Sequence, residues 1–237
     1  MTTELSGVYV LHTRPYRDTS LLVELFSRSQ GRFAAVARGA RAGRRRGGTR
    51  LQVFAPLAVS VTGRSSLKTL GQIEADGRAW PLQGRALFSG LYVNELLHRL
   101  LHHDDPHPTL FDAYLGALAR LSGSDDTEPA LRSFEWQLLA ELGYGFALDR
   151  CGDSGDALLA TATYRFDAEA GLVPARGGDP ADRCFSGGVL LDLAAGSLDG
   201  AARQAAKRLS RLALRPLLGD RPLASRALFQ GSGEPRR

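Results

Sequence analysis

The sequence predicts an α+β protein in which a small closed β-barrel is followed by a helical region. Two observations lead to this fold class. Five short runs with strand character fill about the first 75 of the 237 residues, and from about residue 86 onward the apolar residues recur with helical spacing. Short strands joined by polar turns favour a closed barrel over an open sheet, because closure leaves no exposed edge.

The expected strands span residues 8–13, 20–27, 31–37, 51–62 and 67–74. Pro56 falls inside the fourth run, so that strand should be bent, bulged or at an edge, because proline cannot donate a ladder hydrogen bond. Five strands of this length are typical of the OB-fold, a five-stranded barrel that often binds nucleic acid strands. We therefore expect an OB-fold nucleic-acid-binding domain over residues 1–80.

Helices should follow over residues 81–237. Apolar faces predict helices over residues 86–101, 110–121, 131–142, 199–218 and 223–229, with Pro216 marking or bending the end of the long one. Residues 163–166 and 171–175 should pair as a β-hairpin, and residues 187–193 form a short helix or strand. The prediction is an all-helical domain that contains a small irregular β-hairpin element at about residues 150–187.

Charge is concentrated in the N-terminal part. Residues 1–80 carry thirteen Lys/Arg against five Asp/Glu, whereas the remainder carries seventeen against twenty. Residues 38–50 hold six arginines and no acidic residue, and glycine and alanine fill the gaps. The chain uses arginine in preference to lysine throughout and has only two lysines. This overall preference does not explain why arginines cluster in residues 38–50. A basic loop on a strand scaffold is typical of contact with a polyanion.

We predict that this cluster contacts phosphates and that nearby cations extend the track. Phosphate contacts give affinity without sequence preference. The predicted loop contacts are Arg38, Arg41, Arg44, Arg45, Arg46 and Arg50, and the predicted extension is Arg14, Arg17, Arg32, Arg64 and Lys68.

Aromatic side chains on the expected strands have two possible uses. They can stack on bases, but packing in the core is the more common role for such residues. These aromatics are Tyr9, Tyr16, Phe26, Phe33 and Phe54.

The residues that can ligate metals or catalyse reactions give no recognisable site. His98 and His102 have i, i+4 spacing, but no glutamate lies between them to act as a general base, and a polar helix end in which histidine complements the dipole is the preferred explanation. Cys151 and Cys184 are far apart and belong to no Cys-x-x-Cys pair. The glycines at residues 43–48 lack the Gly-Lys-Ser/Thr ending of a P-loop. We expect no catalytic residue, no metal and no cofactor, and therefore a binding protein rather than an enzyme.

The sequence also predicts the compartment. The first residues lack the charged and apolar regions of a signal peptide, and no stretch reaches the roughly 18 apolar residues of a membrane span. Two cysteines make a disulfide framework improbable. The expected location is the cytoplasm, in association with the nucleoid, with no membrane partner.

Six segments, in order, resemble the RecO family of bacterial recombination mediators. They begin with GVYVLHTRPYRDTSLL at residues 7–22 and the basic turn RGAR at residues 38–41. The helical part adds LFSGLYVNELL at residues 87–97, DPHPTLF at residues 105–111 and ELGYGFALDRC at residues 141–151. The last is LRPLLGDRPLASRALF at residues 214–229.

The resemblance implies DNA repair by homologous recombination. Members of the family bind single- and double-stranded DNA and anneal complementary strands. With RecR they load a RecA-type recombinase onto DNA coated with single-strand-binding protein, whose C-terminal tail should be a partner held by the helical part. Many members carry a four-cysteine zinc element where this chain has Cys151, Ser154 and Cys184, so residues 150–187 resemble a degenerate, zinc-free form.

Two other functions use the same features. An RNA-binding OB-fold module of translation or ribosome assembly would also need a basic barrel. A nuclease would need a cluster of carboxylates for metal ions, and the sequence shows none. Competition between DNA and RNA, and a cleavage test with metal, separate these from an annealing protein.

Overall fold

The computed structural model describes residues 5–41, 50–63 and 67–230. The chain forms two compact units, residues 1–127 with 222–237 and residues 128–221. The domain boundary expected after residue 80 does not coincide with this division into units. That boundary stays a prediction.

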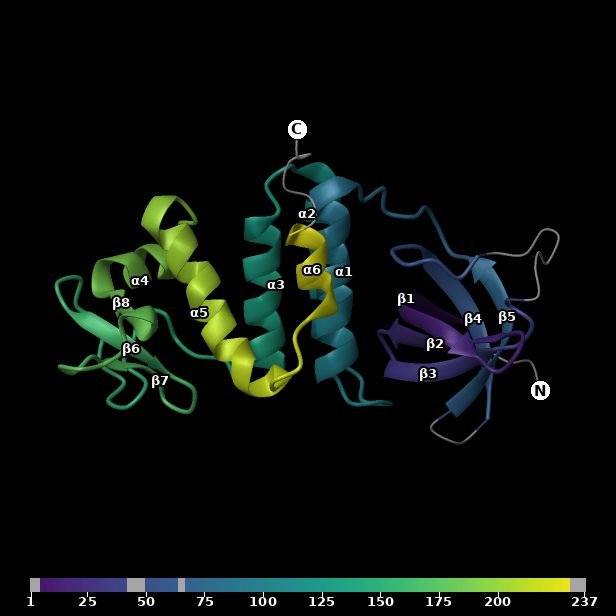
Figure 1. The fold of residues 1–237 in the computed structure, drawn as a ribbon, viewed down its shortest axis with the longest axis horizontal. Coiled ribbons are helices and arrows are strands. Elements are labelled where there is room, and N and C mark those ends of the chain that lie inside the picture. The colour runs from purple at the N-terminus through teal and green to yellow at the C-terminus, as the bar shows by residue number, and fades with distance from the viewer. Residues whose placement is uncertain (1–4, 42–49, 64–66, 231–237) are drawn as a thin grey trace. The chain divides into compact units, whose positions relative to one another are not determined.

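The first unit contains a closed five-stranded barrel, as predicted (Figure 1). Its strands are β1 (Ser6–Tyr16), β2 (Ser20–Ser27), β3 (Gly31–Ala37), β4 (Pro56–Thr62) and β5 (Leu67–Ala75). They pair in the order β1-β2-β3-β5-β4, and β4 pairs back with β1 to close the barrel. The pair β3–β5 is parallel, and the other four pairs are antiparallel.

The fourth strand starts later than predicted. It begins at Pro56 rather than residue 51, because the buried Phe54 has a φ of 63°, outside the extended region. Proline therefore opens the strand and does not interrupt it, which is a position where its missing N–H costs little.

The barrel is apolar on both faces of β1 and β2. Val8 and Val10 belong to the interior cluster together with Val23 and Leu25. The alternate residue Tyr9 is also buried, and its ring meets aromatic rings outside the barrel. Because successive side chains of a strand point to opposite faces, burial on both faces means that helices cover this side of the barrel.

Two helices provide that cover, α1 (Gly84–Leu100) and α2 (Pro108–Gly123). The buried Asn94 of α1 donates from Nδ2 to the carbonyls of Val10 and Leu11, both at 3.3 Å, and Tyr114 of α2 donates to Asn94 Oδ1 at 3.0 Å. Complete burial raises the pKa of Tyr114 well above its usual value, so this hydroxyl stays a donor.

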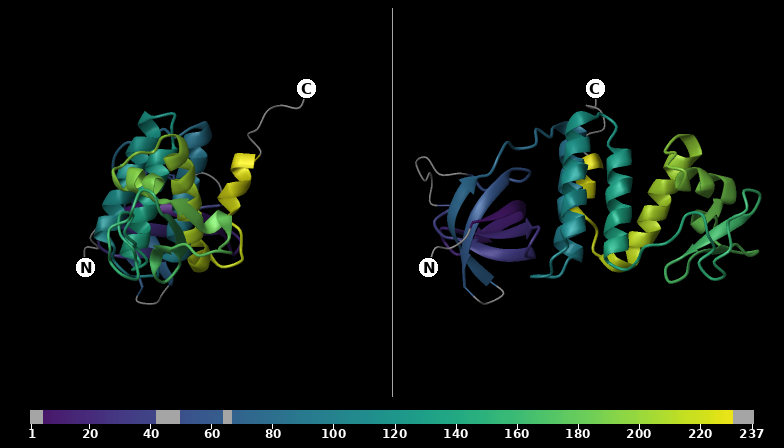
Figure 2. Two further views of the ribbon diagram at one scale, coloured as in Figure 1. Left: turned by 90° about the vertical axis from the view of Figure 1, so that its left-hand side faces the viewer. Right: turned by 180° about the vertical axis from the view of Figure 1, so that it is seen from behind.

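The last helix of the chain, α6 (Ala224–Gln230), returns to this unit and lies beside α1 (Figures 1 and 2). The rings of Phe88 and Phe229 meet edge to face, with centroids 5.9 Å apart. Helices α1 and α6, which are far apart in the sequence, therefore pack against each other.

The second unit contains the helices α3 (Glu128–Glu141), α4 (Gly187–Ala194) and α5 (Gly200–Leu218) and a small sheet (Figure 1). The sheet consists of β6 (Thr163–Asp167), β7 (Gly171–Pro174) and β8 (Cys184–Ser186) in the order β7-β6-β8. A short 3-10 turn, Ala181–Arg183, precedes β8. The predicted hairpin is therefore part of a three-stranded sheet; β8 has only three residues, too few for a periodic signal.

Helix α3 contains a buried ion pair. Arg132 Nη1 lies 2.8 Å from Glu135 Oε2, and both side chains are almost fully enclosed. Lys207 of α5 lies 3.0 Å from Glu128 at the start of α3 and joins the two helices. In the described part of the chain, no helix is long and apolar enough to cross a membrane.

Candidate nucleic-acid interface

An open groove of about 530 Å³ lies at one end of the barrel. We call it the turn groove. It is formed by the turn between β1 and β2, the end of β3 and the start of β5. Its lining residues are Tyr16, Arg17, Thr19, Ser20, Val36, Arg38, Gly39, Leu67, Lys68 and Thr69.

Three of the predicted cations line this groove, and its described lining contains no carboxylate. Arg17 and Arg38 are exposed. The guanidinium of Arg17 lies over the ring of Tyr16, 5.4 Å from its centroid. Cations beside hydroxyl groups and a half-buried aromatic ring provide both phosphate contact and a stacking surface.

Arg41 supports the groove rather than lining it. Its backbone N–H donates to Thr19 at 2.8 Å, and its Nη1 donates to the carbonyls of Arg17 and Asp18 at 3.2 and 3.4 Å. These bonds fasten the loop after β3 to the β1–β2 turn, which has a positive φ of 52° at Arg17. Two basic segments separated by about twenty residues are thereby held together.

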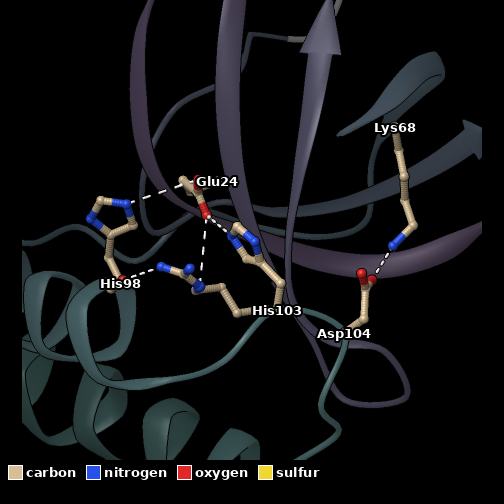
Figure 3. Close-up of polar contacts among 6 residues, drawn as sticks. Glu24, Lys68, His98, His103 and Asp104 are labelled. Atoms are coloured by element: carbon tan, nitrogen blue, oxygen red, sulfur yellow. Dashed lines mark hydrogen bonds and ion pairs between the residues drawn. The ribbon is translucent and has the colours of Figure 1, made fainter. Parts of the chain in front are cut away.

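Lys68 is already paired. Its ammonium contacts the carboxylate of Asp104, as Figure 3 shows, and lies 4.8 Å from the centroid of the Phe33 ring. Only 15% of its side chain is exposed. Its charge in the groove is therefore partly neutralised by a residue from the segment between α1 and α2.

Arg32 is half-buried and is used inside the protein. Its guanidinium donates to the carbonyl of His98 and lies 3.8 Å from Glu24. Burial lowers the pKa of Arg32, and the charge of Glu24 opposes that effect. Arg32 does not line the turn groove.

Glu24 is the centre of this second polar cluster, between His98 and His103 (Figure 3). Its carboxylate lies 3.1 Å from His103 Nε2 and 3.9 Å from His98 Nε2. The ring of His12 stacks on that of His98 at 5.2 Å. Burial lowers the pKa of His98, the positive charge of Arg32 adds to the effect, and Glu24 opposes it. The cluster joins β2 to the C-terminal end of α1.

The other predicted cations are placed differently. Arg14 and Arg50 are exposed but do not line the groove. Arg44, Arg45, Arg46 and Arg64 lie outside the described residues, so their assignment to phosphates stays a prediction.

Most of the barrel aromatics form core. Tyr9, Phe26, Phe33 and Phe54 are buried, and Tyr16 alone among the five aromatics named above lines the groove. Four further residues at this site were not predicted from the sequence, namely Thr19, Ser20, Thr69 and Asp104. They are short polar residues in or near expected strands and helices, and such residues are too common there to mark a site.

Cys151 is buried and Cys184 is partly buried, and both are free. Across residues 5–41, 50–63 and 67–230, no three His, Cys, Asp or Glu side chains come together in a way that would hold a metal ion.

Comparisons with known proteins agree over almost the whole chain. The family model described as "Recombination protein O N terminal" matches residues 1–77, and the one described as "Recombination protein O C terminal" matches residues 81–227. The chain belongs to the RecO family. The first match covers the barrel, and the second covers the helices and the small sheet.

Several curated RecO relatives have similar lengths. The chain is 47% identical over 230 residues to the DNA repair protein RecO of Haemophilus influenzae (strain 86-028NP), with 97% of each chain covered. It is 47% identical over 222 residues to that of Actinobacillus succinogenes, with 93% of each covered. It is 46% identical over 232 residues to that of Pseudomonas aeruginosa (strain LESB58), with 98% of this chain and 97% of the relative covered.

In this RecO chain, backbone hydrogen bonds hold the turn at Cys151. Its N–H donates to Asp156 at 2.8 Å, and its carbonyl accepts from Gly155 at 2.9 Å. The turn is therefore closed by hydrogen bonds within residues 151–156.

Proposed function

We propose that this chain is a recombination mediator in DNA repair, and that the turn groove binds the phosphate backbone of single- and double-stranded DNA. The observation that carries the proposal is the convergence of Arg17, Arg38 and Lys68 on one groove without a carboxylate in its described lining. The relatives named DNA repair proteins support DNA as the polyanion.

Annealing of complementary strands follows from this mode of binding. Cations that contact phosphates screen the repulsion between two strands and raise their local concentration. Because no base is contacted for its identity, strands of any complementary sequence can be annealed. The proposed process contains no covalent step, and the protein acts as a binding partner rather than an enzyme.

The partners belong to the same proposal. The chain works in the cytoplasm at the nucleoid, with RecR, to load a RecA-type recombinase onto DNA coated with single-strand-binding protein. The C-terminal tail of that protein is the proposed partner of the helical part. Annealing of complementary strands coated with single-strand-binding protein, with and without RecR, tests this assignment.

The groove itself is tested with the double variant Arg17→Gln/Arg38→Gln. Both side chains are exposed, so the fold should be retained. Each lost phosphate contact flattens the slope of log K against log salt by about 0.7 for single strands, so a decrease of about 1.4 is expected. The measurement is fluorescence anisotropy of a labelled oligonucleotide at several salt concentrations.

The matched control is Arg85→Gln/Arg176→Gln, which removes the same charge from two exposed arginines outside the groove. The control should bind with the original slope. A groove variant with the original affinity and slope, and with an unchanged circular dichroism spectrum, would show that DNA binds elsewhere. Preference for RNA over DNA in competition would instead favour the RNA-binding alternative.

A further inference from the structure

Helix α5 carries a second concentration of positive charge. It contains Arg203, Lys207, Arg208, Arg211 and Arg215 and no acidic residue. The rest of residues 128–221 holds six cations and thirteen carboxylates. Five of the eleven cations of the unit therefore lie on one helix without a carboxylate among them, a feature that the net charge of the C-terminal part conceals.

Three of these arginines form a row on the exposed face. Arg208, Arg211 and Arg215 are spaced i, i+3 and i+7, which places them on one side of the helix, and all three are exposed. The opposite side holds the buried residues of α5, such as Leu209 and Leu214. We call Arg208, Arg211 and Arg215 the α5 stripe.

Within the described residues, the charges of the α5 stripe are not neutralised by ion pairs. In the described parts of the chain, no carboxylate lies within ion-pair distance of any of the three guanidinium groups. Arg208 is partly engaged, since it donates to the carbonyl of Cys184 and lies over the ring of Phe185. Arg211 and Arg215 have no such contacts with the described residues, so their charges are available to a ligand.

The surroundings favour a nucleic acid backbone over a peptide. Many peptide interfaces combine charged contacts with apolar anchors, and the large exposed apolar side chains of the described chain, Leu5, Tyr144, Leu159 and Leu228, lie outside α5. From Arg208 to Arg215 the helix rises about 10 Å, which spans about three phosphates of one duplex strand at about 3.4 Å each.

We propose that the α5 stripe binds the phosphate backbone of a second DNA strand while the turn groove holds the first. This inference rests on the proposed function, since annealing requires two strands on one protein. The two surfaces belong to different compact units. Each would bind one strand, and neither would read its bases.

The test uses the full chain and two short, non-complementary dT oligonucleotides that carry a donor and an acceptor dye. Energy transfer reports two strands on one protein particle. The variant Arg211→Gln/Arg215→Gln spares Arg208 because of its packing on Phe185. We expect it to bind the first strand within about twofold of the original affinity but to lose most of the energy transfer.

The control Arg85→Gln/Arg176→Gln should keep both signals, because it removes equal charge from exposed positions outside α5. The salt slope for the second strand should fall by about 1.4 in the stripe variant alone. Unchanged energy transfer in a folded stripe variant would overturn the proposal. Loss of binding to a labelled oligoglutamate peptide, with energy transfer retained, would also overturn it and assign the stripe to an acidic protein segment.

The two proposals fail separately. If the turn-groove variant binds the first strand normally and the stripe variant loses the second, the groove assignment is wrong and the stripe assignment stands. If the groove variant loses the first strand and the stripe variant keeps both, only the stripe assignment is wrong.

Discussion

At the scale of single residues, the pairing of each cation decides its use. Arg17 and Arg38 are exposed in the groove, whereas Arg32 is committed to Glu24 and the carbonyl of His98. Lys68 lies between these cases, because it lines the groove but is paired with Asp104. An ion pair of this kind lowers the charge that a phosphate encounters.

The variant Asp104→Asn should therefore strengthen DNA binding. Asparagine keeps the shape and tolerates the positive φ of 58° at this position, while the carboxylate that offsets the charge of Lys68 is removed. We expect a higher affinity for a single strand and a salt slope steeper by up to about 0.7. Anisotropy titrations measure both quantities. The double variant Lys68→Met/Asp104→Asn is the control and should show no gain; a gain there would mean that Asp104 acts by repelling DNA.

At the scale of elements, Glu95 of α1 fixes α6. Its carboxylate accepts from the backbone N–H groups of Ala224 and Ser225, both at 2.8 Å, and from the Ser225 hydroxyl at 2.6 Å. Burial raises the pKa of Glu95, but the hydrogen bonds from Ser225 and Ala224 outweigh it, and the pKa lies below its usual value. The contribution of Glu95 to folding stability is therefore present at pH values above its pKa in the unfolded chain. It is lost as the pH falls through its pKa in the folded protein.

The variant Glu95→Gln should loosen α6 without unfolding the barrel. An amide accepts more weakly than a carboxylate, and the site is partly exposed, so a loss of about 1 kcal/mol is expected. Hydrogen exchange of residues 224–229 should become faster at neutral pH. Glu169→Gln, at an exposed position in the turn between β6 and β7, should leave that exchange unchanged. Equal protection of α6 in both variants would contradict the role of Glu95.

Prediction of the elements from the sequence succeeded where a pattern repeats. The barrel strands and the main helices show periods of 2 or 3.6 residues, and the structure has them close to the expected bounds. It failed at β8, which is too short to repeat, and at the start of β4, where the positive φ of Phe54 leaves no trace in composition.

At the scale of the whole molecule, the first unit is assembled from distant segments, whereas the second is one continuous stretch of the chain. Residues 222–230 return to the first unit, where the Glu24 cluster also connects the barrel to α1. His98 is central to that cluster. The pKa of His98 is lowered by burial and, further, by electrostatic interactions with Arg32, His12 and His103, while Glu24 acts in the opposite direction.

This placement predicts a loss of stability in weak acid. Because the folded pKa of His98 lies below the unfolded value of about 6.5, the unfolded chain binds the proton more readily. The contribution of neutral His98 to folding stability is complete above about pH 6.5 and is lost as the pH falls through the pKa of His98 in the folded protein. His98→Gln should reduce the dependence of the melting temperature on pH in this window, as followed by circular dichroism. His102→Gln, at an exposed position, should leave it intact; identical curves for both variants would exclude His98 as the cause.

The sequence alone determined the barrel, the order of helices, the family and the position of the basic run, because periodicity, composition and motif order are local properties of a chain. Only the tertiary structure decided which cations are available. Arg32 and Lys68 meet their partners across 66 and 36 residues of sequence, and Arg41 supports a turn 24 residues away. The row of arginines on α5 was likewise not apparent from the negative net charge of the C-terminal part. A charge summed along a chain carries no information about which face of a helix bears it.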